Sequence, residues 1–317
     1  MRTDLMATFG PLLTAMASPM RADRSLDLDG AQRLAVHLVE HGSDGIVVAG
    51  TTGESPTLTH DETLRLFRAV VEAVGKQATV VAGVGKNDTV ATVELAGQAA
   101  GCGVDGLLVV NPYYNKPSQR GLAGHFTAVA GATDLPVLLY NIPGRTSVEV
   151  APETLLRLAE DVPTIRGVKD AVGDLAKTGW LAARAPDGFE ILSGDDANCL
   201  PLLAVGGIGL VSVAAHLVGD DLAAMIEAFP SAPAKARDIH LRLLPLLTGL
   251  LAIDTSPGPL KAALDLVGLP GGPVRPPLAG LDAAAAARLV VEPATVELVV
   301  RGAVLELERI DPTALSA

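Results

Sequence analysis

Short apolar runs alternate with longer amphipathic runs along most of the chain. Runs such as GIVVAG, GLLVV and PVLLYN are almost wholly apolar, which is typical of parallel strands covered on both faces. The longer runs repeat apolar residues every three or four positions, which predicts amphipathic helices. Strands are predicted at 12–17, 45–49, 79–83, 106–110, 136–141, 165–169, 189–193 and 210–214. Helices are predicted at 28–41, 61–74, 88–100, 119–132, 152–160, 175–184, 197–205 and 221–229.

The order of these elements predicts a closed (β/α)8 barrel, the TIM-barrel fold of the α/β class. Eight strand–helix units occupy about 220 residues, and such barrels typically take about 250. A doubly wound open sheet is the alternative arrangement of the same units. After residue 229 the pattern changes to helices alone, predicted at 235–251, 259–267 and 282–290 and joined by Pro- and Gly-rich segments.

Three parts of the chain are therefore expected. Residues 1–229 form the barrel that carries the strand ends, and residues 230–290 form a C-terminal helical region packed on it. Residues 291–317 form a tail that alternates Val and Leu with Glu around an Arg-Gly pair. This alternation fits a β-hairpin slightly better than the end of a helix.

Composition narrows the choice of partners. Hydrophobic residues make up 49% of the chain but aromatic residues only 3%, so Ala, Val and Leu must build the core. A formal net charge of −12 argues against a nucleic-acid partner, which requires clustered Lys and Arg. Cys102 and Cys199 lack metal-binding or redox spacing, as expected for reduced core thiols of a cytosolic protein. Without a signal-peptide pattern or a membrane-length apolar run, the protein is expected to be soluble and cytoplasmic.

Lys169 ends the predicted strand 165–169 and belongs to the segment IRGVKDAVG. An ammonium that is removed from water loses hydration, so its pKa falls and the amine becomes nucleophilic near neutral pH. Schiff-base chemistry requires such an amine. The ordinary alternative is a lysine that caps the strand and extends its ammonium into water.

Polar residues follow several of the other predicted strands at the same end, where (β/α)8 enzymes build their active sites. All three tyrosines of the chain are among them, which packing alone does not explain in a chain so poor in aromatic residues. The segments are GTTGES at 50–55, NPYYNKP at 111–117, YNIPGRT at 140–146, KD at 169–170, SGDD at 193–196 and SV at 212–213.

The residue types at these ends suit iminium chemistry. Lys169 can attack a keto carbon, after which the adjacent carbon loses a proton and becomes an enamine nucleophile. Tyr140 is the candidate general acid and base, and the hydroxyls of Thr51 and Tyr114 can relay its proton to water. The N–H groups and hydroxyls of the Gly-Thr-Thr-Gly turn form a candidate nest for a keto-acid carboxylate. Arg145 offers a planar fork to a second carboxylate.

Each of these features also has an ordinary alternative. GTTGES can be a turn with a helix cap, and Tyr113 and Tyr114 can clamp a surface loop. Arg145 can pair with a nearby Asp or Glu. Only the coincidence of these residues at strand ends favours one common site.

Five motifs carry a family resemblance: GTTGES, NPYYNKPSQRGL, LYNIPGRT, GVKDA and LSGDDA. In order and spacing they resemble the pyruvate-dependent class I aldolases and, within that superfamily, the dihydrodipicolinate synthase family. The resemblance runs from about residue 10 to residue 289. It implies a Schiff base between Lys169 and pyruvate, with a proton relay of Tyr140, Thr51 and Tyr114 in which Tyr114 comes from a neighbouring subunit.

The same resemblance implies the substrates and their contacts. Thr51 and Thr52 would hold the pyruvate carboxylate, and Arg145 would bind the carboxylate of L-aspartate 4-semialdehyde. Gly194 and the backbone of Val211 would line the pocket. The enamine would condense with the semialdehyde and the product would cyclise, at the entry to diaminopimelate and lysine, with no metal or organic cofactor and in a homotetramer.

Three positions depart from the family pattern. Asn111 stands where many members have Thr. Thr63 and Ala91 stand where lysine-inhibited members have a His and a Glu, although Ser55, Asn87 and Tyr113 are present. The missing charge partner for the effector implies weak or absent inhibition by lysine.

Two other functions are compatible with the same residues. A sibling aldolase acting on 2-keto-3-deoxy sugar acids or 4-hydroxy-2-oxoglutarate would keep Lys169 and Tyr140 but use a different aldehyde. A catalytically silent binding barrel is the more distant alternative, against which the intact site residues argue.

Overall fold

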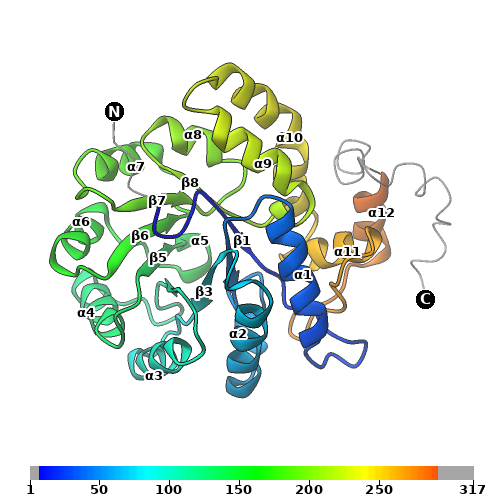
Figure 1. The fold of residues 1–317 in the computed structure, drawn as a ribbon, viewed down its shortest axis with the longest axis horizontal. Helices are drawn as coiled ribbons and strands as arrows, with labels where there is room; N and C mark the ends of the chain where they lie inside the picture. Colours follow the sequence, from blue (N-terminus) through cyan, green and yellow to red (C-terminus); the bar gives the residue numbers. More distant parts are fainter. Residues whose placement is uncertain (1–6, 292–317) are drawn as a thin grey trace.

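The computed structural model describes residues 7–291 and contains a closed barrel of parallel strands (Figure 1). Each strand pairs with the next along the chain, and the last pairs with the first. The prediction of a (β/α)8 barrel is confirmed, and the open sheet is wrong. The strands are β1 (Leu12–Ala15), β2 (Gly45–Val48), β3 (Thr79–Gly83), β4 (Gly106–Val110), β5 (Val137–Asn141), β6 (Ile165–Asp170), β7 (Glu190–Ser193) and β8 (Gly209–Ser212).

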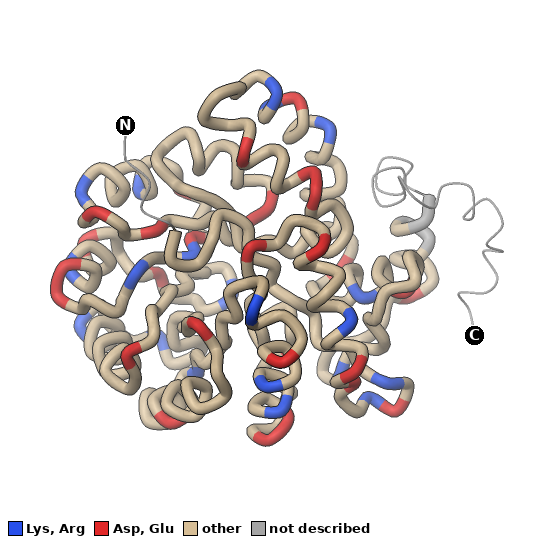
Figure 2. Tube along the Cα trace, viewed as in Figure 1, with Lys and Arg blue, Asp and Glu red and all other residues tan. Residues whose placement is uncertain are grey.

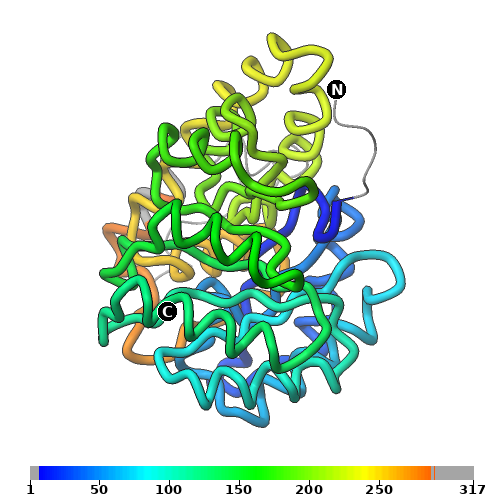
Figure 3. Tube along the Cα trace, turned by 90° about the vertical axis from the view of Figure 1, so that its left-hand side faces the viewer, coloured from blue at the N-terminus to red at the C-terminus, as the bar shows by residue number. Residues whose placement is uncertain are grey.

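Helices surround the barrel and then continue beyond it (Figure 1). Those that alternate with the strands are α1 (Leu28–Glu40), the 3-10 helix η1 (Ser55–Thr57), α2 (His60–Val74), α3 (Thr89–Ala100), α4 (Gln119–Ala130), α5 (Pro143–Thr146), α6 (Pro152–Asp161), α7 (Leu175–Ala182), α8 (Cys199–Ala204) and α9 (Ala215–Ala228). Those of the C-terminal region are α10 (Pro233–Ile253), α11 (Gly258–Leu266) and α12 (Ala283–Val291). Together α9 and α10 form a projecting corner at the top of Figures 1 and 3.

The sequence pattern misplaces one helix start and omits two short helices. Helix α9 begins at Ala215 and not at 221, because the chain leaves helical geometry at Val218, where φ is −135° and ψ is 35°. The acidic pair Asp220 and Asp221 follows this kink and resembles a helix start. The short elements η1 and α5 are not predicted, since neither is long enough to show a helical period. The predicted hairpin in the tail lies outside the described residues.

Alternate positions of each strand face the barrel interior and the surrounding helices. On β2, Val47 packs inside the barrel with Leu13 and Val81. Its neighbours Ile46 and Val48 belong to the cluster that the helices cover. Both faces of the sheet are therefore apolar, which explains why the strands lack a polar alternation.

The segment before β1 closes the N-terminal end of the barrel. Phe9 is fully buried in the inner cluster, and the backbone N–H groups of Thr8 and Phe9 donate to the Glu190 carboxylate. A Cβ at Gly106 would lie 2.8 Å from the Phe9 ring, so a larger residue at that position would displace the ring. Polar side chains, Lys169 among them, lie at the opposite, C-terminal end of the barrel.

The outer surface mixes charges of both signs. Acidic and basic positions are interspersed along the outer helices and their connections (Figure 2). Within residues 7–291, none of the helices combines the length and the apolar character that a membrane span requires.

His216 joins the first strand to the last loop of the barrel. Its Nε2 accepts a hydrogen bond from the Ala17 N–H at 3.1 Å, and its Nδ1 donates to the Val213 carbonyl at 2.8 Å. The ring must be neutral to accept from Ala17. Burial lowers the pKa of His216 to about 4.

Acid should therefore weaken the fold through His216. A histidine whose pKa is lower in the folded state stabilises fully above its unfolded pKa of about 6.5, and this stabilisation is lost as pH falls toward 4. The loss should amount to about 3 kcal/mol of unfolding free energy. Denaturant titrations from pH 7 to 4 should show a steeper decline for the wild type than for His216→Gln. Parallel declines would contradict this role.

Candidate active site

Lys169 and Tyr140 meet at the C-terminal end of the barrel. The β5–β6 register pairs these two residues, so their side chains leave the sheet at the same level. The Lys169 Nζ lies 4.2 Å from the centroid of the Tyr140 ring, within cation–π range. Lys169 is 4% exposed and Tyr140 is 5% exposed. The ordinary alternative required the Lys169 ammonium to extend into water, and the structure contradicts it.

The surroundings change the acidity of both groups. Burial lowers the pKa of Lys169 to about 8, the Asp196 carboxylate opposes this change, and the Arg145 guanidinium adds to it. About one Lys169 amine in ten is then neutral at pH 7. Burial raises the pKa of Tyr140 above its ordinary value, so its phenol carries a proton at neutral pH.

Gly194, after β7, makes room for the Lys169 side chain. A Cβ at this position would lie 3.1 Å from both Cγ and Cε of Lys169 and 2.8 Å from the Ala171 Cβ. The backbone N–H of Gly194 donates to the Asp170 carbonyl at 2.7 Å. The glycine is thus held against the lysine that it accommodates.

Asp196 supplies a buried negative charge near Lys169. Its carboxylate accepts hydrogen bonds from the Ser212 hydroxyl and from the backbone N–H groups of Val213 and Ala214, at the end of β8. These donors stabilise the ionised form, although burial raises the pKa of Asp196.

Arg145 lies on the one-turn helix α5, next to the barrel mouth. Its side chain is exposed, and it makes no ion pair with any carboxylate within residues 7–291, contrary to the ordinary alternative. The preceding strand fixes this loop, because the Asn141 side chain bonds both the N–H and the carbonyl of Val150 at 3.0 Å. Asn111 donates to Asn141 and to the Val148 carbonyl, both at 2.9 Å.

Thr51 and Thr52 follow β2 in a tight turn. The Glu54 N–H donates to the Thr51 carbonyl at 3.0 Å, and the Ser55 N–H donates to the Gly50 carbonyl at 3.3 Å. Thr52 is buried and Thr51 partly so. In the part of the chain that is described, neither threonine hydroxyl forms a hydrogen bond, so both are available to a ligand.

Tyr114 is separated from the other candidates. Its side chain is 87% exposed, and its φ of 74° is in the left-handed region. The neighbouring Asn115 ties the loop to the Asn87 carbonyl at 2.8 Å. A single chain therefore brings together Lys169, Tyr140 and Gly194, but does not join Tyr114 to them by any hydrogen bond among its described residues.

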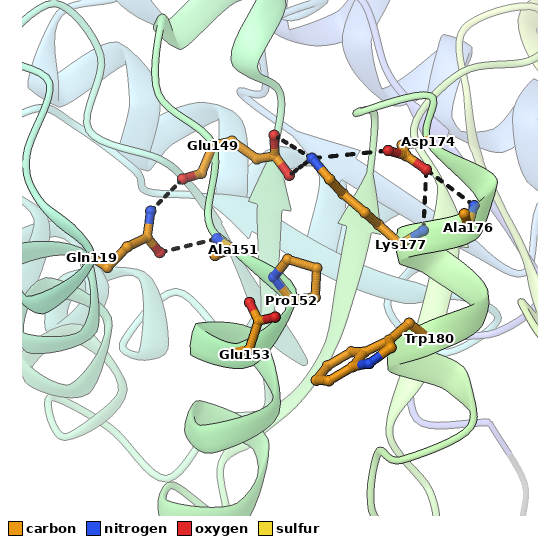
Figure 4. A pocket seen from close by; sticks show the side chains of 9 residues that line it. All are labelled: Gln119, Glu149, Ala151, Pro152, Glu153, Asp174, Ala176, Lys177 and Trp180. Atoms are coloured by element: carbon orange, nitrogen blue, oxygen red, sulfur yellow. Dashed lines mark hydrogen bonds and ion pairs between the residues drawn. The ribbon is translucent and has the colours of Figure 1, made fainter.

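A groove lies outside the barrel, between α6 and α7 (Figure 4). It has a volume of about 570 Å³ and is lined partly by Pro152, Trp180 and Lys177. The Lys177 ammonium is held by the Glu149 carboxylate at 2.8 Å and lies 3.9 Å from Asp174. None of the strand-end candidates lines this groove, so it is distinct from the site around Lys169.

A family model described as the dihydrodipicolinate synthetase family matches residues 8–292. The chain belongs to this family. The resemblance carried by the five motifs is thereby confirmed, and it extends over the barrel and the C-terminal helices.

Individual relatives agree with the family model. The 4-hydroxy-tetrahydrodipicolinate synthase of Moorella thermoacetica is 54% identical over 273 residues, which are 86% of this chain and 93% of the relative. The synthase of the same name from Acidothermus cellulolyticus is 54% identical over 286 residues, or 89% of this chain and 91% of the relative. The crystal structure of the enzyme from Cyanidioschyzon merolae with lysine bound has a TM-score of 0.89 and 43% identity, and the match covers 92% of this chain and all 100% of that one.

The three positions expected to depart from the family pattern have a structural setting. Asn111 is fully buried and supports the Arg145 loop through its bonds to Asn141 and Val148. Thr63 uses its hydroxyl within α2, where it donates to the Thr59 carbonyl at 2.9 Å, and Ala91 lies in the first turn of α3. Weak or absent inhibition by lysine stays a prediction.

Sequence reasoning missed Asp196 and Glu54 as members of the site region. Asp196 stands in the motif LSGDDA next to Asp195, and the sequence alone does not distinguish these two acidic residues. Glu54 stands in the motif GTTGES. Asp195 accepts from the N–H groups of Ala197 and Asn198, which is a turn role, whereas Asp196 is 3% exposed. Burial distinguishes the two, and no local pattern shows it.

Replacing Gly194 with Ala should displace the Lys169 side chain. The added methyl meets Ala171 and Lys169 at contacts that force movement, and small misplacements of a reacting group slow reactions by about 10- to 100-fold. Rates of borohydride-trapped adduct formation with pyruvate would measure the effect. Gly97→Ala on α3, where a Cβ meets nothing within 4 Å, is the matched control and should react as the wild type does. Equal rates for the two variants would contradict the prediction.

The rate of adduct formation should also depend on the pKa of Lys169. Because only the neutral amine attacks, the rate should rise about tenfold per pH unit below pH 8 and level off above it. Initial rates between pH 6 and 10 would locate the midpoint. A midpoint near the ordinary lysine value of 10.5 would show that the amine is not desolvated in solution.

Proposed function

We propose that this chain is a 4-hydroxy-tetrahydrodipicolinate synthase that binds pyruvate as a Schiff base on Lys169. The observation that carries the proposal is the buried amine of Lys169, 4.2 Å from the Tyr140 ring centroid and with its pKa lowered to about 8. Membership of the family and the name of relatives that are 54% identical support the choice of reaction.

The reaction follows from the nucleophilic amine. The neutral Nζ of Lys169 adds to the keto carbon of pyruvate, and the resulting carbinolamine loses water to give an iminium. The methyl carbon then loses a proton to form an enamine, which attacks the aldehyde carbon of L-aspartate 4-semialdehyde. The amino group of the semialdehyde part displaces Lys169, closing the ring and restoring the free enzyme.

Tyr140 donates and accepts the protons of these steps. Its raised pKa keeps the phenol protonated, so it can donate to the oxygen that leaves as water. The proton returns through the hydroxyls of Thr51 and Tyr114. The family resemblance implies that Tyr114 acts on a neighbouring copy in a homotetramer, and its 87% exposure leaves the phenol free for that role.

The substrates bind through complementary groups. Thr51 and Thr52 hold the carboxylate of pyruvate with hydroxyl and backbone donors. Arg145, exposed and without an ion-pair partner among the described residues, receives the carboxylate of the semialdehyde. Gly194 and the backbone of Val211 line the pocket. The substrates are small molecules, no metal or organic cofactor takes part, and the enzyme acts in the cytoplasm.

Borohydride trapping with pyruvate, read by mass spectrometry, tests the assignment of roles. Lys169→Ala should give no adduct because the nucleophile is absent. Tyr140→Phe should form the adduct slowly because proton transfer is impaired. Arg145→Ala should form it at the normal rate but condense poorly with the semialdehyde.

Lys177→Ala is the matched control, since Lys177 lies in the outer groove and is paired with Glu149. It should keep both the adduct and the condensation. An adduct that persists in Lys169→Ala would disprove the proposal. Cleavage of a 2-keto-3-deoxy sugar acid, without a cyclic product from the semialdehyde, would identify a sibling aldolase.

A further inference from the structure

The turn that carries Thr51 and Thr52 is bounded by two residues with left-handed backbones. Ala49 has a φ of 53° and Glu54 has a φ of 56°. Residues other than glycine rarely adopt this conformation, and it persists only where surrounding contacts hold it. The contacts that hold Glu54 come from a distant part of the chain.

Glu54 forms a buried ion pair with Lys261 of α11. The Lys261 Nζ lies 2.7 Å from the Glu54 Oε1, and the two side chains are 2% and 0% exposed. The other Glu54 oxygen accepts from the backbone N–H of Arg275 at 2.8 Å. Both carboxylate oxygens are therefore bound by the C-terminal region.

Lys261 also connects to the start of the loop after β1. Its ammonium donates to the Ser18 carbonyl at 3.0 Å and to the Pro273 carbonyl at 2.9 Å, so its three N–H groups have three acceptors. The Ser18 hydroxyl in turn donates to the Gly53 carbonyl at 2.7 Å. Lys261 thus restrains both Gly53 and Glu54, the two residues that follow Thr52.

Stability alone gives a weak reason for such a pair. Removing two charges from water costs about as much as their attraction returns, so a buried ion pair adds little net stability over an apolar pair of similar size. What the pair does supply is geometry, because each of its hydrogen bonds has a defined direction. Apolar side chains at these positions would leave the backbone of the turn free to relax.

We propose that Glu54 and Lys261 are positioning residues for the carboxylate-binding turn. The inference rests on the proposed function, in which Thr51 and Thr52 hold pyruvate. Neither Glu54 nor Lys261 touches the substrate. Without their pairing, Glu54 relaxes out of the left-handed region and shifts the donors of Thr51 and Thr52.

The decisive variant is the neutral double substitution Glu54→Gln/Lys261→Met, which leaves no unpaired buried charge. The pyruvate concentration that gives half-maximal adduct formation at Lys169 should rise by about tenfold or more, since misplaced groups weaken binding strongly. The KM for the semialdehyde, which binds through Arg145, should change less than about twofold by the same reasoning.

Lys261→Arg is the second variant, because it keeps the positive charge opposite Glu54. A planar guanidinium cannot reproduce the three directions of the ammonium donors, so the half-saturating pyruvate concentration should again rise, by about threefold or more. An unchanged value in either folded variant overturns the proposal, even if the melting temperature falls.

Glu62→Gln is the matched control. Glu62 pairs with the Arg275 side chain at 2.5 Å, so this variant weakens another anchor of the same C-terminal segment but removes neither the Glu54–Lys261 ion pair nor the hydrogen bond that Glu54 accepts from the Arg275 N–H. Its melting temperature should fall while half-saturation by pyruvate stays unchanged. If it raises the half-saturating concentration as much as the double variant does, the effect is general loosening and the proposal is wrong.

Trapping in the wild type separates the two proposals. Absence of a pyruvate adduct at Lys169 in the wild type would refute the proposed function, and the positioning role with it. A normal wild-type adduct, together with unchanged half-saturation in the variants, would refute the positioning role alone.

Discussion

Exclusion of water from the Lys169 ammonium is the constraint on which the rest of the site depends. The apolar interior of the barrel removes hydration from the amine, and the face of the Tyr140 ring replaces part of it. Asp196 limits the effect, because its charge favours the ammonium. The outcome is an amine that is mostly charged at pH 7 but neutral in about one molecule in ten.

This constraint explains why the neighbouring positions are small or anchored. Gly194 leaves the space that the lysine side chain fills. Asn141 and Asn111 hold the loop of Arg145 by side-chain hydrogen bonds. The Arg145 guanidinium therefore lies at the mouth of the barrel and stays exposed. Ordered polar groups around a dry centre suit a reaction in which charge appears and disappears on one nitrogen.

The barrel could be predicted from the sequence because its signals are local. Apolar strands and amphipathic helices show their periods within a few residues, and the ends of the strands locate Lys169, Tyr140 and the Thr51 turn. The pairing of Lys261 with Glu54 spans 207 residues, and no periodicity encodes which helix packs beside which turn. His216 was missed for a local reason, since the kink at Val218 hides the first turn of its helix.

Sealing of the base of the barrel by Phe9 has a consequence for synthesis of the protein. The carboxylate that binds the Phe9 N–H belongs to Glu190, which is 181 residues later. One of the two strands that pair with β1 is β8, the last strand of the barrel. A nascent chain therefore carries an unpaired edge on β1 and an unfastened N-terminal plug until most of it has left the ribosome. Contacts of such long range form slowly, so Phe9 and β1, although translated early, are among the last of the described elements to reach their final place.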